Sequence, residues 1–447
     1  MGDVMTKQTT VVIFNSPLYH DHYEDDENYL PPLGLGYIVS ELKRNGICAN
    51  LVDCVYERLS VEEIINYINL GSFQNVGFNI FSVNMTLLEE IVCNITRPIN
   101  IYWGGKAIAY LWQSIIRWKC TFPMTFIIGE GELILPALIN NRCRENSIFS
   151  DVRNKVYLVD KYSIYYPTNL DKIALDRTIF KNREITNLFG QLESCLVASR
   201  GCIFDCAFCG GSKTTNPNIT PRMRSIKSLD SEICEIMRLC PKVQSVRILD
   251  DLFLRDRKSI SQACQLFNKY PSLNWRCMVH VTSFINNFDL IPVLRHSGCT
   301  EVFIGIESGS DFIRHTIKKV GSVKNVESTV HELLCNGINV KGYFICGFPE
   351  ETEEQIICTY DLATRLWEFS LNTPGKFRAS AFKFRPYHGT ELYRRLFPEG
   401  ENCQYEITNN LVSAHHQYNF SAGNFSSVAN DTLDDYLMKI NSLEHHV

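Results

Sequence analysis

The chain has 447 residues, of which 45% are hydrophobic and 21% are charged, and its formal net charge is -5. This composition excludes general disorder and suits a folded protein of about two to four domains. The near balance of 44 basic and 49 acidic residues gives no reason to expect nucleic acid or an anionic membrane as a partner.

Residues 1–144 alternate short apolar strands with longer helices. The expected strands cover residues 10–14, 49–52, 76–81, 99–103 and 126–128, and the expected helices cover residues 35–44, 61–70 and 85–97. This alternation is typical of a Rossmann-like parallel α/β sheet. Gly, Ser or Asn follows several strand ends, where ligands bind in such sheets.

Residues 145–193 lack clear periodicity, and we expect them to form a linker. The β/α alternation returns in residues 194–396, with strands expected at 195–198, 245–249, 275–281, 301–306, 340–345 and 377–384. This segment predicts a full or partial (β/α)6 barrel. Residues 397–447 are expected to be a short C-terminal extension, helical near residues 432–442.

The chain contains 18 cysteines, and we see neither a signal peptide nor an apolar run long enough to cross a membrane. We therefore expect a cytoplasmic setting, in which cysteines are thiols or metal ligands. Three of them, Cys202, Cys206 and Cys209, have the spacing C-x3-C-x2-C directly after a predicted strand. Such a triplet can ligate three irons of a 4Fe–4S cluster. A structural zinc site is the alternative, but it requires a fourth protein ligand.

This triplet, with the aromatic Phe208 before its last cysteine, resembles the signature of radical S-adenosylmethionine (SAM) enzymes. Further motifs follow in that family's order: RMRS at 222–225, LDD at 249–251, GIESG at 305–309, GFPEET at 347–352 and PYHGT at 386–390. The resemblance implies that the open iron binds SAM and that the reduced cluster cleaves it to methionine and a 5′-deoxyadenosyl radical. It also implies a small-molecule substrate and an external electron donor, such as a flavodoxin or ferredoxin.

The same resemblance implies the residues that bind SAM. Phe208 would lie against the adenine, and Glu307 would accept hydrogen bonds from the ribose. The other residues expected at the SAM site are Asp250, Asp251, Ser308, Gly347 and Glu350. Asp250 and Asp251 could instead cap a helix.

Motifs in residues 1–144 resemble the cobalamin-binding domain that precedes many radical SAM enzymes. The residues that this resemblance assigns to cobalamin are Leu33, Gly34, Ser82, Gly104, Gly105, Lys106, Gly129, Glu130 and Gly131. Glycines suit this task because backbone must approach a large corrin ring. No D-x-H-x-x-G motif is present, so we expect no histidine ligand on cobalt. Lys106 stands where relatives often have Pro-His.

These resemblances together predict a cobalamin-dependent radical SAM enzyme. We expect it to methylate an unactivated carbon of a small metabolite, through a 5′-deoxyadenosyl radical and methylcobalamin, in natural-product or cofactor biosynthesis. One alternative is a rearrangement, cyclisation or ring contraction without methyl transfer, and another is a non-catalytic docking or regulatory subunit. The residues expected near the substrate are Arg276 and His280, which share one face of a predicted strand, and Tyr387.

Overall fold

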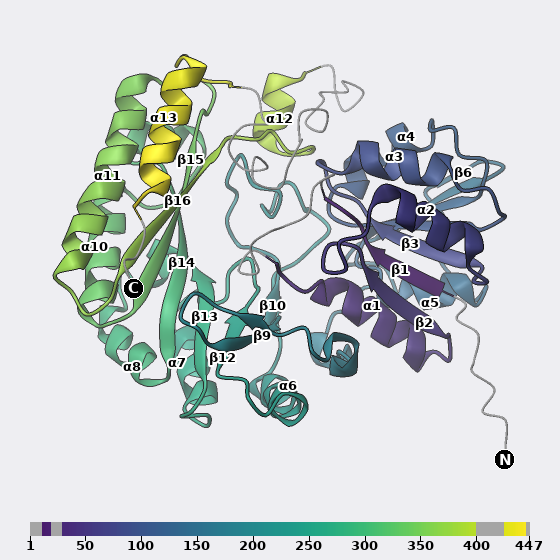
Figure 1. Cartoon of the computed structure of the whole chain (residues 1–447), viewed down its shortest axis with the longest axis horizontal. Helices are drawn as coiled ribbons and strands as arrows, with labels where there is room; N and C mark the ends of the chain where they lie inside the picture. Colours follow the sequence, from purple (N-terminus) through teal and green to yellow (C-terminus); the bar gives the residue numbers. More distant parts are fainter. Residues whose placement is uncertain (1–10, 19–28, 399–423, 444–447) are drawn as a thin grey trace.

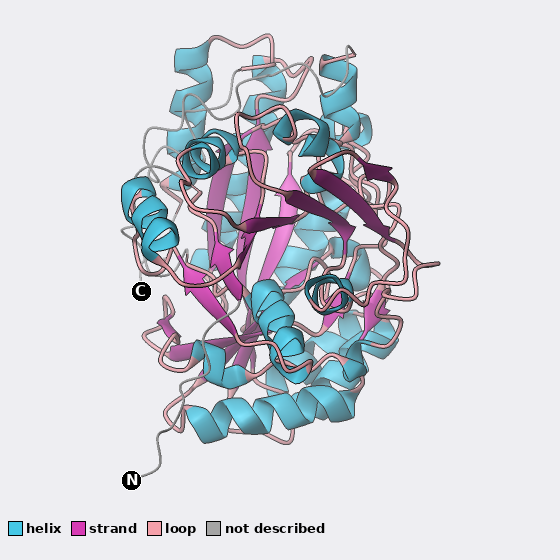
Figure 2. Cartoon of the chain, turned by 90° about the vertical axis from the view of Figure 1, so that its right-hand side faces the viewer, coloured by secondary structure: helices cyan, strands magenta, loops and turns pink. Residues whose placement is uncertain are grey.

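The computed structural model describes residues 11–18, 29–398 and 424–443, which form two α/β units (Figure 1). The first unit is purple to blue in Figure 1, and the second runs from teal to yellow. Figure 2 shows strands in the interior of the molecule and helices over its outer surfaces. No helix within the described ranges is both long and apolar enough to cross a membrane.

The first unit is a seven-stranded sheet with the strand order β2-β1-β3-β4-β5-β7-β6. Its strands are β1 (Val11–Asn15), β2 (Ala49–Asp53), β3 (Asn75–Asn79), β4 (Asn100–Gly104), β5 (Met124–Gly129), β6 (Phe149–Ser150) and β7 (Asn154–Val159). Every neighbouring pair is parallel except β6 with β7. The order reverses between β1 and β3, which is the switch point at which such sheets bind ligands.

Helices cover both faces of this sheet. They are α1 (Leu33–Arg44), α2 (Val61–Leu70), α3 (Met85–Cys93), α4 (Ile108–Ile115) and α5 (Ile134–Ile139). One apolar core joins the sheet to α2, α3 and α4, and a second joins it to α1 and α5. The expected Rossmann-like unit is therefore confirmed.

The segment expected to be a linker has more structure than its sequence predicts. Strand β7 pairs in parallel with β5 along six residues, and β6 pairs with β7. The segment continues through two short 3-10 turns, η2 (Leu170–Lys172) and η3 (Arg177–Phe180), to β8 (Ile185–Thr186). Backbone pairing with distant strands stabilises these pieces, and local periodicity does not report such pairing.

The second unit is an open, curled sheet with the order β16-β15-β14-β13-β12-β9-β8. Its strands after β8 are β9 (Leu192–Leu196), β12 (Ser245–Ile248), β13 (Asn274–Val279), β14 (Cys299–Glu307), β15 (Asn339–Cys346) and β16 (Phe377–Lys383). Six of the seven strands run parallel, and β8 is an antiparallel edge strand. This is the partial (β/α)6 barrel that the sequence predicts.

Helices pack against the convex side of this sheet, and the C-terminal helix closes its β16 edge (Figure 1). They are α6 (Ile226–Leu239), α7 (Arg257–Phe267), α8 (Ile291–His296), α10 (Val323–Cys335), α11 (Glu353–Leu371) and α13 (Asn430–Asn441). Two one-and-a-half-turn helices, α9 (Asp311–Thr316) and α12 (Glu391–Leu396), follow strand ends, and a ribbon pairs β10 (Ser199–Arg200) with β11 (Arg222–Met223). The 3-10 turns η4 (Val281–Ser283) and η5 (Phe288–Leu290) follow β13.

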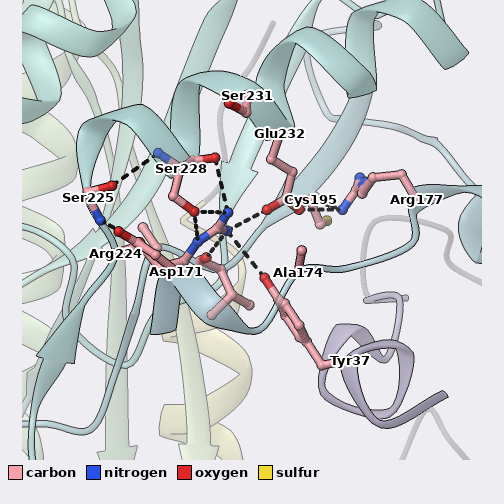
Figure 3. Close-up of polar contacts among 12 residues, drawn as sticks. Tyr37, Asp171, Ala174, Arg177, Cys195, Arg224, Ser225, Ser228, Ser231 and Glu232 are labelled. Carbon is pink, nitrogen blue, oxygen red and sulfur yellow. Dashed lines mark hydrogen bonds and ion pairs between the residues drawn. The ribbon is translucent and has the colours of Figure 1, made fainter. Parts of the chain in front are cut away.

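Buried polar contacts join the two units. Figure 3 shows Tyr37 of α1 beside Arg224, whose Nη1 lies 3.2 Å from the Tyr37 hydroxyl oxygen. Arg224 also pairs with Glu232 of α6, and Arg177 donates to the same carboxylate at 3.2 Å. Burial raises the pKa of Tyr37 to about 12, so its hydroxyl stays neutral. These satisfied contacts fix the orientation of the first unit against the barrel.

Candidate cluster and cofactor sites

The three cysteines of the C-x3-C-x2-C motif lie on one loop beyond the carboxyl ends of β9 and β10. Cys206 is buried, and Cys202 and Cys209 are partly exposed. Backbone N–H groups of Phe204 and Gly211 donate to the sulfurs of Cys202 and Cys209, at 3.5 and 3.3 Å. Donors aimed at sulfur stabilise thiolates, which is the form that binds iron.

The loop is anchored through Ala207, the residue after the buried cysteine. The N–H of Ala207 donates to the carbonyl of Ile317, and the N–H of Leu392 donates to the carbonyl of Ala207. Burial raises the pKa of Cys206 to about 12, so this thiol needs a bound cation to lose its proton. Across the described part of the chain, no three His, Cys, Asp or Glu side chains surround a single ion position. Cysteines that each bind a different iron of one cluster need no such arrangement.

Asp250 and Asp251 follow β12 and have different surroundings. Asp250 is buried and accepts hydrogen bonds from the N–H of Ala198 at 2.7 Å and the hydroxyl of Ser199 at 2.6 Å. Burial raises the pKa of Asp250 to about 6. Asp250 thus holds the strand that leads into the cysteine loop, and Asp251 is the more exposed carboxylate. Its Oδ1 lies 3.3 Å from the Nζ of Lys106.

Glu307 ends β14 on the side of the barrel where the cysteines lie. Its backbone has a φ of +67°, a left-handed region that few non-glycine residues occupy. The buried carboxylate pairs with the equally buried Lys319 at 3.0 Å. Lys319 carries no motif that sequence analysis recognises, because only the fold of the loop after α9 brings it to Glu307.

The remaining residues expected at the SAM site have different surroundings. Phe208 packs edge-on against Phe348 at a centroid distance of 5.7 Å, beside the cysteine loop. Ser308 is fully buried and lies 3.2 Å from the hydroxyl of Thr359. Ser308 therefore supports the backbone after Glu307, and its contact with SAM stays a prediction.

The loop after β15 is held by a glutamate that its sequence motif does not single out. Glu351 is fully buried, and one of its oxygens accepts from the N–H groups of Gly347 and Phe348, at 2.6 and 3.1 Å. Glu350, the expected cofactor contact, instead has a side chain that is 71% exposed. Burial shows that Glu351 holds the loop, which sequence spacing does not reveal, and the contact of Glu350 with SAM stays a prediction.

Arg276, an expected substrate contact, is fully buried on the concave face of the barrel. Its guanidinium donates to Glu193 at 2.5 and 2.8 Å and to Glu301 at 2.7 Å. Glu301 also binds Arg378 of β16. The geometry therefore does not support a substrate contact for Arg276. These four side chains form a charged layer, called the barrel floor below, near the amino ends of the strands.

His280 and Tyr387 lie nearer to the carboxyl ends of the strands. The ring of His280 packs on Phe204 of the cysteine loop at a centroid distance of 4.1 Å, and its Nδ1 lies 2.8 Å from the hydroxyl of Thr282. The Nε2 of His280 is buried with no hydrogen-bond partner, and burial lowers the pKa of this ring to about 2. Because its neutral ring lies beside the cysteine loop, His280 stays a candidate substrate contact. Tyr387 is 38% exposed and stays a prediction.

A cavity of about 940 Å³ lies between the first sheet and the barrel. Its wall is mostly apolar, and its volume is at the upper end of the range for ligand sites, about 300–1,000 Å³. Most residues assigned to cobalamin line it: Gly34, Gly104, Gly105, Lys106, Gly129, Glu130 and Gly131. The fold thus brings three separate segments of the first unit to one cavity.

The glycines that line the cavity are needed there for two different reasons. A Cβ on Gly34 or Gly104 would meet no atom within 4 Å, so these glycines leave open space for a close ligand. Gly105 and Gly129 have φ values of +105° and +104°, and a Cβ there would collide with the backbone of Ile80 or Val159. The expectation that glycines admit a ligand therefore fits the first pair, whereas folding itself requires the second pair.

Two residues assigned to cobalamin do not line this cavity. Leu33 is buried in a core with Tyr37 and Phe180. Ser82 is buried against the barrel, and its hydroxyl lies 3.0 Å from Nδ1 of His388. Both residues help to dock the units, and their contact with cobalamin stays a prediction.

A second cavity, of about 230 Å³, lies beside Cys202, Asp250 and Asp251. Both cavities share part of their walls, including Lys106, Glu130 and Arg200. Arg200 pairs with Glu130 at 2.6 Å and with Glu132 at 2.7 Å. These buried ion pairs hold Arg200 and Gly201, the two residues before Cys202, against the first unit.

Comparison with known proteins agrees with this geometry. The family model of the radical SAM superfamily matches residues 196–363. The chain is 25% identical over 394 residues to an uncharacterized methyltransferase of Pyrococcus horikoshii, covering 86% of this chain and 80% of that protein. It is 23% identical over 416 residues to the anaerobic magnesium-protoporphyrin IX monomethyl ester cyclase of Rubrivivax gelatinosus, covering 89% of this chain and 72% of that protein.

A solved structure has the same fold as this chain. It is the radical SAM methyltransferase TsrM of Kitasatospora setae with cobalamin and a 4Fe–4S cluster bound. The TM-score is 0.63 at 15% identity, and the match covers 88% of this chain and 78% of that one. At this identity the likeness concerns the fold, and it confirms the predicted pairing of a parallel-sheet unit with a partial barrel.

Proposed function

We propose that this chain, whose residues 196–363 match the family model of the radical SAM superfamily, is a cobalamin-dependent methyltransferase acting on an unactivated carbon of a small molecule. The observation that carries this proposal is the position of the large cavity. It shares a wall with the smaller cavity beside the cysteine loop, so ligands in the two cavities would be neighbours. A reaction that combines a radical with a methyl carrier requires such neighbouring sites.

The chain's residues fit the two cofactors and the cluster. When bound, the cluster and SAM would supply a carbon-based radical, and cobalamin would carry the methyl group. Cys202, Cys206 and Cys209 would hold the cluster, and Glu307 with Asp251 would orient SAM. Gly34 and Gly104 leave room for a close ligand in the large cavity. The apolar walls of that cavity exclude water from the reacting groups.

The names given to similar proteins support this proposal. The Pyrococcus horikoshii protein is named a methyltransferase, and TsrM binds cobalamin and a cluster in the same fold. The Rubrivivax gelatinosus protein is named a cyclase, so ring formation without methyl transfer is the second candidate. The proposal also includes an external electron donor, such as a flavodoxin or ferredoxin, and a cytoplasmic location.

The first experiment is anaerobic reconstitution of the full chain with iron, sulfide and hydroxocobalamin. We expect a 4Fe–4S absorbance, retained cobalamin, and 5′-deoxyadenosine formed from SAM in the presence of dithionite. Cys206→Ala should lose the cluster and this product, whereas Cys335→Ala, which changes an exposed cysteine on α10, should retain both. Protein that retains the cluster but no cobalamin would contradict the methyltransferase proposal.

A second assay separates the two candidate reactions once a substrate is found. Methyl transfer consumes SAM in two ways and yields S-adenosylhomocysteine together with 5′-deoxyadenosine. Ring formation without methyl transfer yields 5′-deoxyadenosine alone. Quantifying both products by mass spectrometry therefore decides between methyltransferase and cyclase.

A further inference from the structure

Lys106 belongs to the first unit, but its side chain reaches the barrel. Its Nζ lies 3.3 Å from Oδ1 and 3.5 Å from Oδ2 of Asp251, beyond the carboxyl end of β12. The backbone before it is constrained, because a Cβ on Gly105 would lie 2.6 Å from the carbonyl oxygen of Ile80. The close packing of β4 on β3 thus sets the direction in which Lys106 leaves its strand.

Asp251 lies directly beside one of the cluster cysteines. A Cβ built on Gly211 would lie 3.5 Å from Oδ1 of Asp251 and 3.6 Å from the sulfur of Cys209. The carboxylate and the sulfur therefore border the same small space. The Lys106 ammonium extends from the wall of the large cavity to the rim of this space.

Lys106 differs from the other charged residues that both cavities share. Arg200 and Glu130 are held in a network with Glu132, in which their side chains are at most 17% exposed. The Lys106 side chain is 52% exposed, and the Asp251 side chain is 39% exposed. An exposed pair between flexible side chains is weak, so Lys106 can change partners at little cost.

We propose that Lys106 couples the binding of the two cofactors by exchanging partners. In the absence of both, its ammonium pairs with Asp251 and competes with the α-amino N–H groups of SAM for that carboxylate. Cobalamin in the large cavity presents carboxamide oxygens, which accept hydrogen bonds from Lys106 and draw it away from Asp251. Each cofactor thereby frees a partner for the other, and the two bind with positive cooperativity.

The size of the coupling follows from the pair that must break. An exposed ion pair contributes a factor of about two to five to an equilibrium constant. Cobalamin should therefore tighten SAM binding by about this factor, and SAM should tighten cobalamin binding equally, because coupling free energies are reciprocal. This inference rests on the proposed function, since it requires that the chain binds both cofactors.

Anaerobic equilibrium dialysis of the cluster-reconstituted full chain tests the coupling. The Kd of labelled SAM is measured with and without saturating hydroxocobalamin, and the Kd of hydroxocobalamin with and without SAM. Wild-type protein should show the same two- to fivefold tightening in both directions. Lys106→Met should bind SAM more tightly than wild type without cobalamin and should show no further tightening when cobalamin is added.

The control is Lys119→Met, which removes an exposed lysine of the same unit that lines neither cavity. It should behave as wild type. Independent binding of the two cofactors to wild-type protein would overturn the inference and leave the proposed function intact. Weaker SAM binding by Lys106→Met would also overturn it, because Lys106 would then be a direct SAM ligand. Failure of the reconstituted chain to bind cobalamin at all would overturn both proposals.

Discussion

The barrel floor yields the sharpest prediction about stability. Arg276→Met removes a guanidinium that makes three contacts with Glu193 and Glu301, at 2.5, 2.7 and 2.8 Å, where all three side chains are fully buried. Glu193 then keeps neutral donors from Ser245 and Asn187, and Glu301 keeps Arg378. Breaking a buried ion pair from one side costs about 3–5 kcal/mol. We expect the free energy of unfolding to fall by this amount.

Urea denaturation at pH 7, followed by far-UV circular dichroism, measures this loss. Arg276→Lys keeps the charge but not the two-pronged geometry, so it should lose less stability than Arg276→Met. Adding Glu193→Gln to Arg276→Met should recover part of the loss, because it removes one uncompensated buried charge. Comparing the three variants separates the cost of a buried charge from the cost of lost packing.

The pH dependence provides a further check on the same residues. Burial alone would raise the pKa of Glu301, but Arg378 and Arg276 hold it below its usual value. The stability that this carboxylate contributes is therefore present above its unfolded pKa and is lost as pH falls through its lowered folded pKa. In Arg276→Met the acid-induced loss should begin at a higher pH. An unchanged urea midpoint combined with lost substrate turnover would refute this reasoning and restore Arg276 as a substrate contact.

Two further predictions concern the loops around the cofactor sites. Burial raises the pKa of Glu351 to about 7, so wild-type stability should decrease as pH rises from the ordinary carboxyl range through 7. Thermal melts of Glu351→Gln should show no such decrease. The same dependence of melting temperature on pH in the variant and in wild type would contradict this role of Glu351. Gly129→Ala should destabilise the chain by more than about 1 kcal/mol because its φ is +104°, whereas Gly104→Ala should melt like wild type but retain less cobalamin. Equal melting temperatures for both variants would show that the turn after β5 does not require glycine at position 129.

Much of the architecture could be predicted from local pattern. Strand and helix alternation depends on periods of two and 3.6 residues, which the sequence displays directly, and both α/β units follow from it. The cysteine triplet is equally local, because eight consecutive residues suffice to bring its three sulfurs onto one loop. Local pattern does not predict strand β7, because its stability comes from pairing with β5, about 30 residues earlier.

The roles of individual charged residues depended on tertiary structure. Arg276 and His280 share one face of the strand predicted over residues 275–281, and sequence alone treats them alike. The fold buries Arg276 between Glu193 and Glu301 and leaves Nε2 of His280 without a partner near the cysteine loop. Glu350 and Glu351 are likewise neighbours, and only burial shows which one holds the loop.

By itself, the sequence determined the class of chemistry, since three closely spaced thiols and a series of strand-end motifs are features of contiguous chain. Only the tertiary structure decided how the two halves cooperate. Lys106 and Asp251 are 145 residues apart in sequence, and their contact exists because the first unit docks on the barrel. The interaction between two charges depends on their distance in space, which cannot be read from their spacing along the chain.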